Sequence, residues 1–208
     1  MDNYIITIAR GFGSGGKTIG EELGQKLGVR VYNQEILDMA AERSGINEEL
    51  FRLADEHVKK KGKKNRPMYE GRLIPPSDKE FVSRLNMFNY QAKVMVNLAQ
   101  TESCIIIGRA ADYILRYFTN VVSVNIQAPL DACIAEVMDR YRMTEEEARR
   151  EIITTDKKRQ DFYAYYTGQT WGDPKNYDLS LNSARLGRDK CADAIIEFAE
   201  RKLGKKLR

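Results

Sequence analysis

The sequence predicts an α/β fold in which helices cover both faces of a parallel β-sheet. Short apolar runs alternate along the chain with longer segments of helical periodicity, and this alternation is typical of parallel sheets. A glycine-rich loop follows the first apolar run at once and precedes a helical segment. Such a loop lies at the carboxyl edge of the sheet, where folds of this class bind their ligands.

The N-terminal part of the chain supplies two strands and a helix. The first strand covers about residues 4–9, and the helix after the loop runs from about Lys17 to Leu27. Gly28 ends this helix, because glycine is favoured just past a helix C-terminus. A brief extended piece over residues 29–32 follows.

Helices and a connection are expected next. A helix over about residues 34–43 ends at Ser44-Gly45, and Asn47 fits the cap of another helix. From Val58 to about Pro76 the periodicity disappears, which predicts a mobile or exposed connection. Its basic residues are Lys59, Lys60, Lys61, Lys63, Lys64 and Arg66.

The middle of the chain returns to the alternation of helix and strand. Ser77 precedes a long helical stretch that reaches about Gln100. The compact apolar runs Cys104–Ile107 and 121–126 have the length and composition of buried parallel strands.

The C-terminal part is mostly helical. A long charged helical region spans about residues 130–166, and Thr144 followed by three glutamates marks a helix start within it. Residues 177–181 form the last expected strand, and a closing helix runs from about Arg188 to Leu203.

The glycine-rich loop, Gly11–Thr18, matches the phosphate-binding pattern G-x-x-x-x-G-K-[ST] in full. Lys17 is expected to contact the β- and γ-phosphates of ATP, and the Thr18 hydroxyl to bind Mg²⁺. A plain glycine-rich turn is the alternative, but it does not account for the unbroken Gly-Lys-Thr ending. Backbone N–H groups would cradle the phosphates at Gly11, Gly13, Ser14, Gly15 and Gly16.

These observations together predict a three-layer P-loop NTPase fold with a parallel five-stranded sheet, a helical lid and an acceptor-binding insert. One domain is expected over residues 1–208. Its core would comprise about 1–33, 101–140 and 175–208. The acceptor-side helical insert would cover about 34–100, and the lid about 141–174.

Composition limits the class of protein. Hydrophobic residues make up 42% and charged residues 31%, which is ordinary for a soluble globular chain. No apolar run approaches the roughly 20 residues of a membrane span, and the N-terminus lacks a signal-peptide pattern. We therefore expect a cytoplasmic protein without membrane contact, either monomeric or homodimeric. The net charge of +4 suits a phosphate ligand and does not by itself imply nucleic acid binding.

The inventory of reactive side chains excludes two kinds of site. His57 is the only histidine and sits among charged residues, so it is expected to be an exposed helix residue. A Ser/His/Asp hydrolase and a histidine-ligated metal site are therefore excluded. The three scattered cysteines are expected to be buried free thiols, and they are Cys104, Cys133 and Cys191.

Arg109 is a candidate phosphate ligand. Gly108-Arg109 directly follows the apolar run Cys104–Ile107, so the arginine would face the same sheet edge as the glycine-rich loop. A guanidinium there can bind a phosphate with two hydrogen bonds. A surface arginine at a helix start is the alternative.

The segment 156–168 combines basic and aromatic residues. In a helix, Asp156, Arg159 and Tyr163 would share one face. Such a helix could close over the phosphates as a lid and supply positive charge during transfer. The alternative is a solvated charged helix.

Taken together, the chain resembles the cytidylate kinase-like family, relatives of bacterial cytidylate kinase among the P-loop nucleoside monophosphate kinases. The resemblance runs from the first strand to the last. The matching stretches are Gly11–Thr18, 105–115, Arg159 with Tyr165-Tyr166, Trp171–Pro174 and Tyr177–Asn182.

The resemblance implies a role for several residues. The P-loop would hold ATP, Arg109 would contact the acceptor monophosphate, and Arg159 would clamp the phosphates during transfer. Asp178 would meet a cytosine ring or position a substrate-binding arginine. Asn33 falls where the family's acceptor-site segment begins, so it is expected to bind substrate.

The chain also departs from the family. Cytidylate kinases carry Asp-Ser-Gly-x-x-Tyr-Arg where this sequence has Asn33–Met39. The amide replaces an acid, and Met39 replaces a phosphate-side arginine. Ile107 stands where the family has an acid before Gly-Arg, so Mg²⁺ would rest on Thr18, water and the nucleotide.

The sequence thus predicts an ATP-dependent kinase of a nucleoside monophosphate, with CMP or dCMP as the first candidate acceptor. Lys17, Arg109 and Arg159 are the expected catalytic residues. The departures leave two alternatives open: a kinase of another small metabolite, and a nucleotide-binding regulatory protein with little turnover. Nucleic acid binding by the lysine cluster is a weaker alternative.

Overall fold

The computed structural model describes residues 3–56 and 71–207. The expectations for His57 and for the lysine cluster at 59–66 fall outside these residues and stay predictions.

Among the described residues, five parallel strands form one sheet in the order β2-β3-β1-β4-β5. This confirms the expected fold class and strand number. The central strand β1 pairs with β3 on one side and with β4 on the other. The strands are β1 (Ile5–Arg10), β2 (Arg30–Tyr32), β3 (Cys104–Ile107), β4 (Val121–Gln127) and β5 (Leu179–Asn182).

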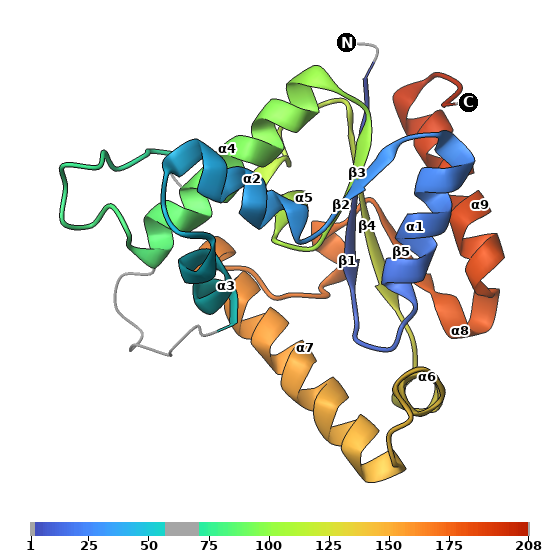
Figure 1. Ribbon diagram of the computed structural model, residues 1–208. Coiled ribbons are helices and arrows are strands. Elements are labelled where there is room, and N and C mark those ends of the chain that lie inside the picture. Colours follow the sequence, from blue (N-terminus) through green and yellow to red (C-terminus); the bar gives the residue numbers. More distant parts are fainter. Residues whose placement is uncertain (1–2, 57–70, 208) are drawn as a thin grey trace.

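Helices cover both faces of the sheet, as Figure 1 shows with the sheet seen nearly edge-on. One face carries α1 (Gly16–Leu27) and α9 (Arg188–Leu203). The other carries α2 (Glu35–Ser44), α4 (Arg84–Thr101) and α5 (Ala111–Ile114). The remaining helices are α3 (Glu48–Glu56), α6 (Leu130–Tyr141), α7 (Glu145–Thr167) and α8 (Ser183–Leu186), with a 3₁₀ turn at Pro174–Asn176.

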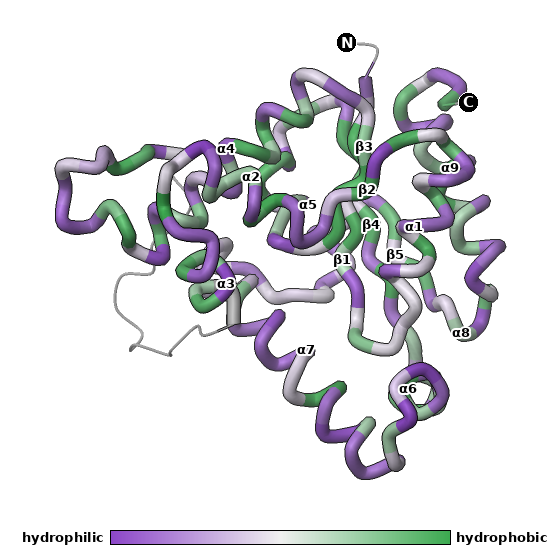
Figure 2. Tube along the Cα trace, viewed as in Figure 1, coloured by the Kyte–Doolittle hydropathy of each residue, from purple (hydrophilic) through white to green (hydrophobic). Residues whose placement is uncertain are grey.

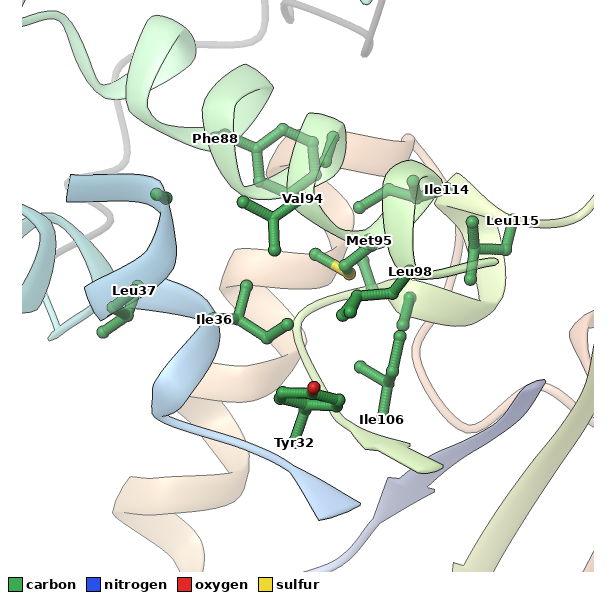
Figure 3. Packing of buried hydrophobic residues seen from close by; sticks show 14 of the residues in the cluster. Tyr32, Ile36, Leu37, Phe88, Val94, Met95, Leu98, Ile106, Ile114 and Leu115 are labelled. Atoms are coloured by element: carbon green, nitrogen blue, oxygen red, sulfur yellow. The ribbon is translucent and has the colours of Figure 1, made fainter. Parts of the chain in front are cut away.

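The central strands β1, β3 and β4 are largely apolar because both of their faces are mostly buried. Alternate side chains point to opposite faces, so Ile105 packs toward α1 and α9 while Ile106 packs toward α2 and α4. Figure 3 shows the second layer, where Tyr32 and Ile106 of the sheet meet Ile36 of α2 and Met95 of α4. Each such buried aliphatic side chain stabilises the fold by about 1.5–3 kcal/mol.

Helix α7 extends beyond the sheet next to α6 (Figure 1), and much of its length is hydrophilic (Figure 2). Thr144 forms a capping box with Glu147 at its start, as the sequence predicts. The C-terminal end of α7 is held in the core, where the rings of Tyr166 and Phe88 stack at 3.9 Å between centroids. The predicted long helical region is thus two helices, separated at Arg142, which has a left-handed φ of 57°.

The predicted start of the fourth helix at Ser77 is wrong. Helix α4 begins at Arg84, and Ser83 is its cap, because the Ser83 hydroxyl accepts a hydrogen bond from the Asn86 N–H. The Asn86 side chain also bonds both backbone groups of Ile74, at 2.8 and 3.1 Å. These contacts hold the preceding segment in turns, so helix formation starts later than the sequence pattern suggests.

Two expectations from composition can be compared with the structure. Cys104, Cys133 and Cys191 are buried and free, as predicted. Over the described ranges 3–56 and 71–207, no helix is both long enough and apolar enough to cross a membrane.

Candidate functional site

The glycine-rich loop connects β1 to α1 and has the backbone of a phosphate cradle. Gly13 and Gly15 have φ values of 80° and 76°, which glycine adopts without strain. A Cβ at Gly13 would lie 2.7 Å from the carbonyl oxygen of Cys133, so no side chain fits there. The Ser14 hydroxyl donates to the Gly11 carbonyl at 2.8 Å, and Ser183 donates to the Ser14 carbonyl at 2.6 Å. The loop is therefore fixed in a shape that turns α1's N-terminal amides toward a ligand.

Lys17 and Thr18 begin helix α1 beside this loop. The Lys17 side chain is 57% exposed, and its ammonium lies 3.6 Å from Glu21. The Thr18 hydroxyl accepts a hydrogen bond from Arg140 of α6 at 3.2 Å. Arg140 is a second cation at the loop, and the sequence pattern did not single it out.

A magnesium ion near Thr18 would have to be shared with a nucleotide. Within the part of the chain that the structure describes, no group of three or more His, Cys, Asp or Glu side chains could form a metal cage. Mg²⁺ commonly keeps several waters and uses one or two protein ligands together with substrate phosphates. The Thr18 hydroxyl could serve as such a protein ligand once its hydrogen bond from Arg140 is released.

A strained turn after β3 sets the orientation of Arg109. Gly108, Arg109 and Ala110 have successive φ values of 80°, 58° and 53°. A left-handed conformation costs a non-glycine residue of order 1–3 kcal/mol, and such strain collects at functional sites. The Arg109 guanidinium donates to the Asn33 carbonyl at 2.8 Å and to the Gln91 side chain at 3.4 Å. The turn thus brings Arg109 to the end of β2, as predicted from the sheet edge.

Arg10, the last residue of β1, is an additional arginine of the site. Its guanidinium lies against Gly108, where a Cβ would collide with it, and its Cβ lies against Gly16. The sequence analysis missed Arg10 because this residue falls between the expected strand at 4–9 and the loop Gly11–Thr18. Its position just before the loop, at the carboxyl end of a parallel strand, was a usable signal.

Helix α7 contacts the loop through Asp156 and Arg159. The Asp156 carboxylate accepts from the Phe12 N–H at 2.8 Å, and Arg159 donates to the Arg10 carbonyl at 3.0 Å. The two side chains also bond each other at 3.1 Å, so they share a helix face as predicted. Burial lowers the pKa of Arg159 and raises the pKa of Asp156. The pair is therefore partly removed from water at the entrance of the loop.

Two cavities adjoin at this edge of the sheet. The first, the loop cavity, has a volume of about 300 Å³ and is lined by Gly11, Phe12, Gly13, Gly15, Lys17 and Arg140 among others. The second, the side cavity, has a volume of about 180 Å³ and is lined by Asp112, Lys158, Phe162, Tyr163 and Trp171 among others. Among the described residues, four line both cavities, namely Arg10, Asn33, Arg109 and Arg159. The boundary between the cavities thus carries three guanidinium groups.

Asp112 is the buried acid of the side cavity. The residue is 7% exposed, and its carboxyl group accepts a hydrogen bond from the Tyr163 hydroxyl at 2.6 Å. Burial raises the pKa of the Asp112 carboxyl to about 6. The sequence analysis did not select Asp112, although an acid one turn after Gly108-Arg109 was a usable signal.

Asp178 does not join the other predicted substrate residues. It precedes β5 and accepts from the Ser123 N–H at 2.8 Å and from the Ser123 hydroxyl at 3.0 Å. It also forms an ion pair with Lys202. Asp178 lines a third cavity of about 190 Å³, which shares only Asp112 with the side cavity among the described lining residues. Asp178 thus lies at the amino end of a strand, away from the loop, and its contact with the acceptor stays a prediction that this geometry does not support.

Comparisons with known proteins agree with this architecture. Residues 5–185 match the model of the cytidylate kinase-like family. No curated protein matches the chain.

Solved structures share the fold. An uncharacterized protein from Eubacterium ventriosum ATCC 27560 is 24% identical, with a TM-score of 0.70 over 95% of this chain and 99% of that one. A shikimate kinase from Acinetobacter baumannii, in complex with shikimate, is 12% identical, with a TM-score of 0.50 over 100% and 97%. A shikimate kinase from Bacteroides thetaiotaomicron is 14% identical, with a TM-score of 0.50 over 97% and 98%. At these identities the likeness shows a fold that P-loop kinases share.

Proposed function

Because this chain belongs to the cytidylate kinase-like family, we propose that it transfers the γ-phosphoryl group of ATP to a nucleoside monophosphate, with CMP or dCMP as the first candidate. The family and the fold support a kinase in general. One observation carries the assignment of the two substrates: three arginines lie at the boundary between the loop cavity and the side cavity. Positive charge at such a boundary stabilises a phosphoryl group that passes between two bound molecules.

The loop cavity is the proposed ATP site. The backbone amides of the loop would hold the phosphates, and Lys17 would bind the β- and γ-phosphates. Mg²⁺, held by the Thr18 hydroxyl, would neutralise charge on the phosphate oxygens. Arg140 lines the same cavity and adds a further cation there.

The side cavity is the proposed acceptor site. Arg109 and Arg10 would bind the acceptor phosphate at the boundary, and Asn33 lies beside them. Phe162 and Trp171 offer aromatic surface to a planar base. The geometry thereby supports Asn33 and Arg109 as acceptor residues and gives no support to Asp178.

The proposed chemistry is an in-line displacement. An oxygen of the acceptor phosphate forms a bond to the γ-phosphorus while the bond from that phosphorus to the β–γ bridging oxygen breaks, and ADP leaves. The residues supply position and positive charge, with no covalent intermediate on the protein. Lys17, Arg109 and Arg159 are the proposed catalytic residues, and Arg10 is added to them.

The test is a direct assay of phosphorylated product. The purified full chain is incubated with ATP, Mg²⁺ and CMP, dCMP, UMP or AMP, and ADP and the nucleoside diphosphate are both measured. We expect the diphosphate of at least one acceptor in amounts equal to ADP. Tight ATP binding without product from any acceptor would instead support a regulatory nucleotide-binding protein.

A kinase of another small metabolite is the second candidate. It is favoured by Asn33 and Met39 in place of the family's acid and arginine, and by the modest 180 Å³ volume of the side cavity. The same assay with the hydroxy acids shikimate and gluconate distinguishes the two candidates. Product from a hydroxy acid, and none from any nucleotide, would replace the nucleoside monophosphate assignment.

A further inference from the structure

The C-terminal end of α6 lies against the glycine-rich loop and the start of α1. The Arg140 guanidinium donates a hydrogen bond from Nη1 to the Thr18 hydroxyl at 3.2 Å, although the two residues are 122 positions apart in sequence. The ring of Tyr141 stacks on the ring of Phe12 in the loop, with 5.8 Å between the centroids and 19° between the planes. The fold therefore places a cation of α6 on the hydroxyl that would bind Mg²⁺ in the proposed function.

The Thr18 hydroxyl is a poor ligand for two cations at once. Its oxygen has two lone pairs, and the guanidinium of Arg140 uses one of them. A magnesium ion approaches an oxygen ligand to about 2.0–2.1 Å, so a guanidinium on the same oxygen would lie close to the metal. Like charges at such a separation repel, and they do so more strongly in a half-buried position such as that of Thr18. Arg140 and the metal are thus competitors for one oxygen.

Arg140 has a second place to bind once it leaves the hydroxyl. It lines the loop cavity together with Lys17 and the loop glycines Gly13 and Gly15. Its bond to Thr18 is one contact with a neutral oxygen, whereas a guanidinium can form two parallel, charge-assisted bonds to a phosphate. Arg140 is also exposed, so packing does not confine its side chain. The phosphates of a nucleotide in the loop cavity would therefore receive the released guanidinium.

We propose that Arg140 and Mg²⁺ compete for the Thr18 hydroxyl, and that binding of the metal transfers Arg140 to the phosphates of the nucleotide. This inference rests on the proposed binding of ATP in the loop cavity. Before the metal binds, Arg140 keeps a positive charge on the hydroxyl at the start of α1. After the metal binds, the same guanidinium adds positive charge to the reacting phosphates. Arrival of the metal is thereby coupled to delivery of a second cation.

The test is equilibrium binding of ATP to the purified full chain, measured by isothermal titration calorimetry with Mg²⁺ and, separately, with EDTA. The metal factor is the Kd in EDTA divided by the Kd with Mg²⁺. Wild type is compared with Arg140→Met, which keeps an unbranched side chain and removes the charge and the donors. The metal no longer has to displace a guanidinium in this variant. We therefore expect the metal factor to rise about 10-fold or more, as for removal of one charged hydrogen bond.

This rise should depend on the oxygen of Thr18. Thr18→Val replaces the hydroxyl with a methyl group of similar size, so Arg140 and the metal both lose the atom for which they compete. In the Thr18→Val background, Arg140→Met should change the metal factor by less than about 2-fold. A rise as large as in the wild-type background would overturn the inference, because Arg140 would then oppose the metal without the hydroxyl.

Arg142→Met is the matched control. Arg142 is a neighbouring arginine whose side chain is 87% exposed and lies 3.9 Å from Asp139, so its loss should leave the metal factor at the wild-type value. Thermal unfolding of each variant checks that it is folded. A metal factor at or below the wild-type value in folded Arg140→Met overturns the inference while the proposed function stands, because Arg140 would then only bind phosphate. Absence of ATP binding by wild type under both conditions contradicts the proposed function itself.

Discussion

The carboxylate of Asp156 accepts a hydrogen bond from the backbone N–H of Phe12 at 2.8 Å. A side chain from the middle of α7 therefore contacts the second residue of the phosphate-binding loop, although the two are 144 positions apart in sequence. The position of α7 and the conformation of the loop are coupled through this bond and the neighbouring bond from Arg159 to the Arg10 carbonyl.

Replacing Asp156 by Ala is expected to weaken this coupling. The variant removes the carboxylate that the Phe12 N–H and the guanidinium of Arg159 now share, which costs about 1–3 kcal/mol of unfolding free energy. Urea unfolding measures the loss. Asp161→Ala, on the same helix and paired with Lys157, should change stability by less than about 0.5 kcal/mol. Equal losses in the two variants would contradict a specific role of Asp156.

Replacing Lys17 by Ala is expected to abolish most turnover and leave the fold intact. The substitution keeps the loop's backbone amides and removes the cation, so kcat should fall by about 100-fold or more. Because the side chain is 57% exposed, the unfolding temperature should hardly change. Product formation at near the wild-type rate would remove Lys17 from the proposed mechanism.

Arg10 should matter as much as the arginines that the sequence singled out. Arg10→Gln is expected to lower kcat/KM for the acceptor by about 100-fold, because a positive charge at the boundary between the two cavities is lost. Arg201→Gln removes a guanidinium that is paired with Glu197 on the surface of α9, and it is the control. A loss of activity that is equally large in both variants would indicate a general effect of charge.

Gly108→Ala separates crowding from backbone strain. The new Cβ would collide with the Arg10 guanidinium, at a φ of 80°. Gly204 also has a positive φ, of 66°, but a Cβ at that position would meet no neighbouring group within 4 Å. Both alanine variants should lose stability, of order 1 kcal/mol from strain, whereas only Gly108→Ala should lose activity. Unchanged activity in folded Gly108→Ala would show that Arg10 can move without consequence.

The stability of the protein should depend on pH through Asp112. Burial raises the pKa of this carboxyl from 3.8 to about 6 in the folded state, so the folded state holds the proton more tightly than the unfolded state. The contribution of Asp112 to stability therefore falls as pH rises from about 4 to 6, by roughly 3 kcal/mol. Above about pH 6 the full free-energy cost of burying the ionised Asp112 carboxyl is present.

Urea unfolding of wild type and Asp112→Asn between pH 4 and 8 measures this dependence. The amide does not titrate, so the wild type should lose stability relative to the variant across that interval. A difference between the two proteins that is constant with pH would contradict the raised pKa.

Local patterns predicted much of the fold and part of the site. The loop Gly11–Thr18 and the position of Arg109 depend on a strand and the residues directly after it, and short-range sequence carries that information. The start of α4 was misplaced because Ser77 and Ser83 can both cap a helix as far as the sequence shows. The bonds between Asn86 and Ile74 hold the segment before Ser83 in turns, so the helix begins after Ser83. Such contacts depend on the folded chain.

The remaining site residues depend on which elements meet across the sheet. Arg10 and Arg140 belong to no motif, and Asp112 lies in the matching stretch 105–115 without a role of its own there. Each acquires its place in a cavity from neighbours on other elements. Asp178 lies within a stretch that resembles the family, and in the structure it is bonded to Ser123 of β4. The expected parallel strand over 177–181 already puts Asp178 near its amino end, so the resemblance, and not the strand pattern, assigned it to the acceptor site.

The strained turn at Gly108–Ala110 connects Arg109 to Asp112, and both of these residues line the side cavity. Arg109 precedes Asp112 by only three residues, and the left-handed backbone between them fixes their separation. The turn therefore sets the length of molecule that can reach from the guanidinium to the carboxyl group. An insertion or deletion of one residue there would change the size of acceptor that fits, even with every lining side chain retained.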